Sequence, residues 1–181
     1  MPPTVGNFPL SGVAKLPNVT VAFPGEHWSR AKAQEPIVPG EAVVEVNQGG
    51  VLYVKRAAAA DSDSKRVAIA LRTVQVPDVN TGPGQIGPNE IVNQLIPVGE
   101  YVHTYFSGAF HITLIKPDTY APADLIGWDP AAARPTGKGG TGAWVKAADE
   151  DSALFSVQEF RPVNPAKTEG LLTVRSLRGQ F

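Results

Sequence analysis

The sequence predicts an all-β fold, a small sandwich or barrel of about seven to nine short, mostly antiparallel strands. Short runs of β-branched and aromatic residues recur along the chain with turn-forming residues between them, a pattern typical of strands. The 181 residues also include 18 glycines and 17 prolines, which interrupt long helices. Hydrophobic residues make up 43% of the chain, which is enough for a packed core.

The expected strands follow apolar runs bounded by turn residues. In chain order they lie at residues 41–46, 51–55, 66–76, 101–106, 109–115, 144–147, 152–161 and 171–177, while residues 91–96 are compatible with a strand or a helix. The first two are expected to form a hairpin around residues 47–50. The strands on either side of Ser107 and Gly108 are expected to form a second one, with a two-residue turn. Within 66–76 the apolar residues change faces after Leu71, which indicates a bulge or a strand buried on both sides.

Residues 1–40 are predicted to form an extended arm before a β domain at residues 41–181. Seven prolines fall in this segment, and each fixes φ and favours extended backbone before it. Its apolar residues are therefore expected to pack on the β domain or on a neighbouring subunit. Only residues 28–34 are expected to form a helical turn or two, with Ser29 as the cap. A second Gly/Pro-rich stretch, at about residues 117–142, is expected to be a loop insertion.

Composition and charge exclude several classes of function. The chain contains no cysteine, which excludes disulfides, thiolate metal sites and cysteine nucleophiles. Its net charge is −1 and only 18% of its residues are charged, so no overall field attracts nucleic acid or an anionic membrane. Its apolar stretches are far shorter than the roughly 20 residues of a membrane helix. We therefore expect no nucleic-acid or membrane partner, and no secretory signal.

Two glycine-rich segments match parts of nucleotide-binding motifs. Residues 82–87 (GPGQIG) match the dinucleotide pattern G-x-G-x-x-G, but prolines within and after the run leave no room for the following helix. Residues 137–142 (GKGGTG) resemble a fragment of a phosphate loop but precede a strand. Both are expected to be loops, the second with one exposed lysine, Lys138.

Catalytic and metal-binding patterns are equally weak. His103 and His111, on the predicted 101–115 hairpin, would point to opposite faces of one sheet and could not share a metal ion. No other His/Asp/Glu cluster has metal-ligand spacing, and the nucleophile motifs of hydrolases are absent. The sequence therefore predicts no catalytic residue, no metal and no cofactor, in a protein that is not an enzyme.

Three segments carry a resemblance to a known family. They are residues 36–45 (PIVPGEAVVE), residues 67–71 (VAIAL), and residues 97–103 (PVGEYVH) together with 106–109 (FSGA). In these segments the chain resembles the head decoration, or capsid cement, proteins of tailed bacteriophages. The first looks like the family's entry into its barrel after an extended arm, the second like its core strand, and the third like its later hairpin.

The resemblance implies a structural virion protein, made in the host cytoplasm and bound to the outer surface of the assembled capsid. Its partners would be the major capsid protein, whose neighbouring subunits it bridges, and further copies of itself, with a trimer favoured. Aromatic residues are frequent carriers of interface energy. The candidate interface residues are Phe8, Leu10, Leu16, Phe23 and Trp28 as anchors of the arm, and Arg175 and Phe181 near the C-terminus.

Two other functions stay open at this point. The protein could be another phage virion component, a tail-tube or head–tail joining subunit, since such proteins are also β-rich with long loops. It could instead be a carbohydrate-binding module. In that case Trp128, Trp144 and Tyr120, in or beside the 117–144 region, would be the stacking platforms.

Overall fold

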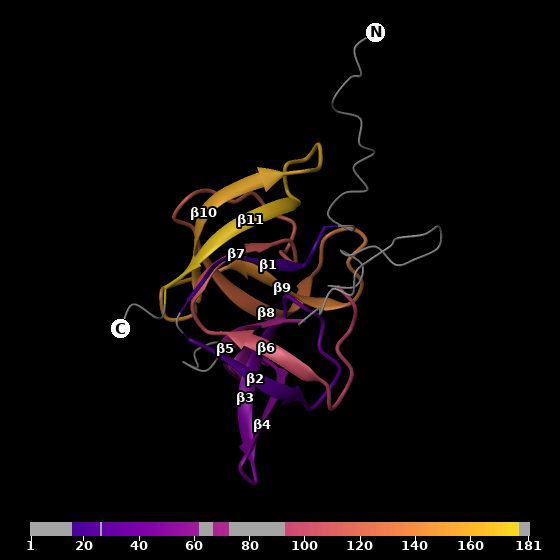
Figure 1. Cartoon of the computed structure of the whole chain (residues 1–181). Helices are drawn as coiled ribbons and strands as arrows, with labels where there is room; N and C mark the ends of the chain where they lie inside the picture. The colour runs from indigo at the N-terminus through magenta and orange to yellow at the C-terminus, as the bar shows by residue number, and fades with distance from the viewer. Residues whose placement is uncertain (1–15, 26, 62–66, 73–92, 178–181) are drawn as a thin grey trace.

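The computed structural model describes residues 16–25, 27–61, 67–72 and 93–177. These residues form eleven strands and one 3₁₀ turn, η2 (Ala59–Asp61), so the predicted all-β class is confirmed. The strands make up one six-stranded sheet and one closed barrel of five strands. Figure 1 shows the sheet above the barrel, with the β3–β4 hairpin projecting away from the sheet. No helix in the described ranges is long and apolar enough to cross a membrane.

The barrel contains β2 (Trp28–Ala33), β3 (Ala42–Gln48), β4 (Val51–Arg56), β5 (Val67–Leu71) and β6 (Tyr101–Tyr105), in the spatial order β2-β4-β3-β5-β6. Antiparallel pairing of β2 with β6 closes it, and β2 runs parallel to β4. The predicted hairpin around residues 47–50 is confirmed as β3–β4. Gly49 and Gly50 make its turn with φ of 60° and 83°, a region that glycine enters without steric cost.

The six-stranded sheet contains β1 (Val19–Pro24), β7 (Gly108–Ile112), β8 (Leu125–Ala133), β9 (Thr141–Lys146), β10 (Phe155–Pro162) and β11 (Gly170–Ser176). Their spatial order is β1-β7-β11-β10-β8-β9. β10 and β11 form a long antiparallel hairpin with a bulge. The predicted strands at 152–161 and 171–177 are thus confirmed with small shifts in their ends.

Barrel and sheet share one large core, because β3 and β5 are buried on both faces. Alternate residues of these two strands pack against aromatic rings of the sheet: Ala42, Val44, Val67 and Ile69. The intervening residues pack within the barrel: Val43, Ala68 and Ala70. Small alanine side chains fit the narrow interior of a five-stranded barrel. The strand predicted to be buried on both sides is therefore confirmed over β5.

The predicted hairpin around Ser107 and Gly108 is wrong. β6 pairs with β2 and β5 in the barrel, whereas β7 pairs with β1 and β11 in the sheet. The Phe106 N–H donates to the carbonyl of His27, and Gly25 lies so close to Ser107 that a Cβ there would be 2.1 Å from its Oγ. The chain thus passes from the sheet to the barrel between β1 and β2, and from the barrel back to the sheet between β6 and β7. These two crossings lie side by side where a hairpin was expected.

The described part of the predicted arm is built into both sheets. β1 pairs with β7, and β2, where a helical turn was predicted, is a barrel strand. Proline is tolerated here because Pro24 ends the edge strand β1, and Pro36 and Pro39 lie outside the strands. The placement of the domain boundary at residue 40 stays a prediction.

A nine-residue strand, β8, occupies the centre of the stretch predicted to be a loop insertion. The loop prediction overlooked it because Pro130 and three alanines mask the strand pattern. Pairing with β9 shifts register between Asp129 and Ala133, so Pro130 lies in the irregular part of the ladder, where its missing N–H breaks no regular bond.

Candidate functional site

One surface of the barrel carries a row of exposed and partly exposed aromatic and basic side chains. Its members share the outer face of β2 and β6 and form cross-strand pairs: Trp28 with Tyr105, Arg30 with His103, and Lys32 with Tyr101. We call these six residues the aromatic face. Ala31, Ala33 and Val102 alternate with them and are buried, so the period of two places the six outside the barrel.

The rings of the aromatic face are held by one another. The ring centroids of Trp28 lie 5.7 Å from His103 and 6.4 Å from Tyr105. Arg30 places its guanidinium carbon 4.0 Å above the Tyr101 ring, within the range of a cation–π contact. Trp28 nevertheless keeps 56% of its surface exposed, and Tyr101 keeps 47%. Large apolar rings are therefore presented to solvent in a fixed arrangement.

The aromatic face is basic as well as apolar. Arg30 and Lys32 both approach the Tyr101 ring. Partial burial and the positive charge of Arg30 lower the pKa of His103 below its usual value. The nearby carboxylate of Glu45 lies on the other side of the ladder, where it accepts a hydrogen bond from Ser29. This face therefore suits a partner with apolar and acidic groups.

The structure places the described interface candidates as follows. Phe23 is 70% exposed and Trp28 56%, and they are the two most exposed large aromatic side chains among the described residues. Leu16 is half-buried, and Arg175 is exposed on β11. Phe8, Leu10 and Phe181 lie outside the described residues.

Two of the candidates share one row of the six-stranded sheet. Phe23 on β1 and Arg175 on β11 both pair with Ala109 of β7, which lies between them. Directly opposed residues share a face of a sheet. The sheet thus brings an exposed phenyl ring and an exposed guanidinium group to the same outer surface, two strands apart.

Sequence reasoning missed Tyr101, Tyr105, Arg30 and Lys32. The available signal was the period-two alternation of residues 101–105 (YVHTY), whose odd positions are aromatic or histidine. His103 and His111 do lie apart, as predicted, but because they belong to the barrel and the sheet respectively.

The rings assigned to carbohydrate stacking are buried, so that assignment is wrong. Trp144 is 0% exposed, Trp128 5% and Tyr120 8%. The two indole rings pack edge to face with centroids 5.2 Å apart, and Trp144 also meets Phe155 at 5.0 Å. These rings form the core between sheet and barrel and cannot reach a sugar in solvent.

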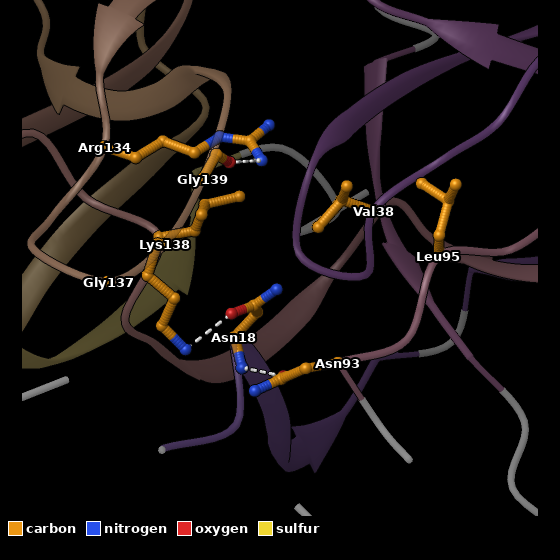
Figure 2. A pocket seen from close by; sticks show the side chains of 9 residues that line it. Asn18, Val38, Asn93, Leu95, Arg134, Gly137, Lys138 and Gly139 are labelled. Atoms are coloured by element: carbon orange, nitrogen blue, oxygen red, sulfur yellow. Dashed lines mark hydrogen bonds between the residues drawn. The ribbon is translucent and has the colours of Figure 1, made fainter. Parts of the chain in front are cut away.

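A pocket of about 260 Å³ opens beside the β8–β9 loop. Lys138 of that loop points across it toward Asn18, as Figure 2 shows, while Val38 and Leu95 line the opposite side. The Lys138 Nζ donates hydrogen bonds to the Leu16 carbonyl at 2.5 Å and to Asn18 Oδ1 at 2.6 Å. Burial lowers the pKa of Lys138 to about 8. The expectation of an exposed lysine is therefore wrong.

The same pocket fixes the backbone just before β1. Asn93 accepts a hydrogen bond from the Asn18 N–H at 2.6 Å and donates one to the Leu16 carbonyl at 2.8 Å. The Thr113 hydroxyl donates to the Pro17 carbonyl at 2.8 Å. Side chains from three distant parts of the chain thus hold residues 16–18 in one position.

Arg134 also lines the pocket (Figure 2) and joins it to the barrel. Its guanidinium donates to the carbonyls of Gly139 and Gly142 and pairs with the fully buried carboxylate of Glu41. Arg56 also reaches Glu41, at 2.9 Å. One carboxylate thus pairs with two guanidinium groups here. In the described ranges, no three His, Asp or Glu side chains are placed to hold a metal ion.

Comparisons with known proteins return few matches. No protein-family model matches the chain, and no curated protein matches it. Among solved structures, the chain is similar to the N base of the head fiber gp8.5 of bacteriophage phi29, with a TM-score of 0.45 and 12% sequence identity. The match covers 86% of this chain and 97% of that chain.

Proposed function

We propose that the chain is a structural virion protein that binds the outer surface of an assembled phage capsid and stabilises it by bridging neighbouring major capsid subunits. The observation that carries this proposal is the exposure of Trp28. A tryptophan with more than half its surface in solvent, yet held against His103 and Tyr105, is organised for contact with another protein.

The aromatic face has the composition of a protein interface. Trp, Tyr and Arg are the residue types that most often carry binding energy, and the face presents two of its three aromatic residues well exposed beside Arg30. Its rings are already ordered, so binding loses little side-chain entropy. The row of Phe23 and Arg175 offers a second contact on the sheet. Two separate contact surfaces suit a protein that bridges two shell subunits.

The proposed partner, the major capsid protein, is inferred from the sequence resemblance to capsid cement proteins. A shell repeats each binding site many times, so contacts that are individually weak add up by avidity when the protein is an oligomer. A trimer, and contacts through Phe8, Leu10 and Phe181, remain predictions. Localisation at the outer capsid surface rests on the same resemblance.

Co-sedimentation tests the proposal. The purified protein is mixed with empty heads assembled from the major capsid protein of the same phage, and the pellet is analysed for a fixed ratio of the two chains. We expect the wild-type protein to saturate the heads and Trp28→Ala to bind at least tenfold more weakly. Val51→Ala is the matched control, since Val51 is also an exposed apolar side chain of the barrel, 42% exposed on the β3–β4 hairpin.

Thermal melts of all variants establish that each is folded. Absence of wild-type protein from the pellet would overturn capsid binding. Equal binding of wild type and Trp28→Ala would remove the aromatic face from the interface. Light scattering on the purified protein adds a second readout, because rings or tubes formed without heads would favour the tail-tube or head–tail joining alternative.

A further inference from the structure

We propose that the pocket beside the β8–β9 loop is a binding site for a carboxylate group, with Lys138 as its cationic partner. The proposal does not depend on the capsid-binding function. It rests on a lysine without a carboxylate partner among the described residues, on the composition of the pocket wall and on the size of the opening.

The ammonium group of Lys138 contacts only neutral oxygens among the described residues. It donates to a backbone carbonyl, that of Leu16, and to the side-chain amide oxygen of Asn18. Within the described ranges no carboxylate oxygen lies within 4.0 Å of its Nζ, and an ammonium group has three donors. Charges taken out of water are normally paired, and this partly buried one has hydrogen bonds but no carboxylate partner among the described residues. Burial desolvates this ammonium group and lowers its pKa, in agreement with the geometry.

Among the residues that the structure describes, the charged groups near Lys138 do not supply a negative charge to it. Arg134 lines the same pocket and is itself cationic. The Glu41 carboxylate on the far side of Arg134 already binds two guanidinium groups, those of Arg134 and Arg56. Glu169, near the start of the loop, accepts hydrogen bonds from the N–H and hydroxyl of Thr136. The described residues that line the pocket therefore carry positive charge, in a chain whose net charge is −1.

The rest of the wall favours an organic acid. Val38, Leu95 and Leu114 line the pocket together with the polar groups, and Figure 2 shows Val38 and Leu95 facing Lys138 across the opening. Leu95 is 51% exposed. A short alkyl chain would contact these side chains while its carboxylate meets Lys138. At about 260 Å³ the pocket is smaller than the usual site for a drug-sized ligand, so it suits a small acid or one acidic side chain.

The same chemistry has two sources, a free small carboxylic acid or an Asp or Glu side chain of a bound polypeptide. Sodium butyrate is the probe for the shared chemistry. Isotope-labelled full-length protein is titrated with butyrate at constant ionic strength, and the amide signals of Gly137 and Gly139 are followed by NMR. Butyramide, which has the same shape without the charge, and sodium chloride are the ligand controls.

Wild-type protein should show saturable shifts with butyrate and at least tenfold weaker binding of butyramide. Lys138→Met should lose at least tenfold in affinity for butyrate, whereas Lys55→Met, which removes an exposed lysine of β4, should bind as wild type does. Non-saturable shifts, or equal binding of butyrate and butyramide, would overturn the proposal.

A measurement on the wild-type protein alone guards against misfolding of Lys138→Met. The Lys138 pKa is followed by the ¹³Cε chemical shift with and without butyrate. A bound carboxylate should raise it from about 8 toward its ordinary value of 10.5. The charged groups facing the pocket, Arg134 with Glu41 behind it, are the same in both samples. An unchanged pKa at saturating butyrate would contradict the proposal independently of any variant.

Carbodiimide cross-linking separates the two sources. The reagent joins an amine to a carboxylate only when the two are in contact. In a pellet with phage heads, a Lys138 cross-link to an acidic residue of the shell protein would identify a polypeptide side chain as the ligand. Butyrate binding without that cross-link, in a pellet that contains both chains, would identify a free small acid.

Discussion

Glu41 and Arg134 form an ion pair that connects the barrel to the six-stranded sheet. The side chain of Glu41, just before β3, is 0% exposed, and that of Arg134, just after β8, is 4% exposed. The other oxygen of the carboxylate accepts the N–H of Val38 at 2.9 Å, and the remaining guanidinium donors bind the carbonyls of Gly139 and Gly142. The hydrogen bonds of both side chains therefore fix loops, and the ion pair determines how the barrel and the six-stranded sheet meet.

Removing one member of this pair should be strongly destabilising. Glu41→Gln leaves two guanidinium groups without a counter-charge, and Arg134→Met leaves a buried carboxylate with only Arg56. We expect each to lower the free energy of unfolding by about 3–5 kcal/mol, and the double variant to lose less than the sum. Urea denaturation measures all three. Glu159→Gln, which breaks the exposed pair with Arg161, is the control and should change nothing measurable.

Trp144 and Trp128 offer a matched test of one buried hydrogen bond. The Trp144 indole N–H donates to the Gly40 carbonyl at 2.7 Å, whereas that of Trp128 makes no hydrogen bond within the described part of the chain. Both rings are nearly fully buried and pack against each other. Replacement by phenylalanine removes the same atoms from each. The additional loss of stability in Trp144→Phe therefore measures the contribution of the hydrogen bond.

We expect Trp144→Phe to destabilise the protein by about 1–3 kcal/mol more than Trp128→Phe, because it leaves a buried carbonyl unpaired. Chemical denaturation with equal m-values would establish that only stability changed. Equal losses for the two variants would contradict this assignment.

Burial of Lys138 predicts a stability that increases with pH in the alkaline range. Its pKa is about 8 in the folded protein and 10.5 in the ordinary state. Between these values the unfolded chain binds more protons than the folded one, so the free energy of unfolding rises with pH. Compared with Lys138→Met, the wild-type protein should gain stability from pH 8 to pH 10.5, and both should run parallel below pH 7. Parallel curves across the whole range would exclude a depressed lysine pKa.

The elements that could be predicted from the sequence are those specified by neighbouring residues. The β3–β4 hairpin follows from its Gly49-Gly50 turn, and β5 follows from apolar residues on both of its faces. The predicted hairpin around Ser107 is wrong because the local sequence pattern is satisfied equally well when its two strands pair with other strands. Two of their actual partners, β1 and β2, lie about eighty residues earlier, in a segment whose prolines concealed the strands.

The same distinction, between features specified by neighbouring residues and features that depend on distant ones, applies to the candidate site residues. Phe23 and Trp28 could be nominated because aromatic residues in a segment that cannot form its own core need a partner, and both are exposed. The Lys138 pocket could not be nominated, because its bonds to Leu16 and Asn18 span 122 and 120 residues. The sequence shows a lysine among glycines, and only the topology supplies the acceptors.

His103 should respond to the charge of Arg30. Partial burial is the larger cause of its lowered pKa and the positive charge of Arg30 the smaller. Arg30→Gln should therefore raise the pKa of His103 but leave it below 6.5, because burial remains. An NMR titration of the imidazole signals measures this directly. Lys32→Gln is the control on the same face, since Lys32 does not contribute to the shift, and it should leave the pKa of His103 where it is.

The sign of the effect on stability follows from the same shift. As pH falls below 6.5, the unfolded chain binds a proton at this histidine before the folded one does, so the free energy of unfolding decreases. The decrease should be smaller in Arg30→Gln than in the wild-type protein. A His103 pKa that does not rise in this variant would show that solvent screens the Arg30 guanidinium from the imidazole ring. The charge of Arg30 would then act on the aromatic face less strongly than its 4.0 Å cation–π contact with Tyr101 indicates.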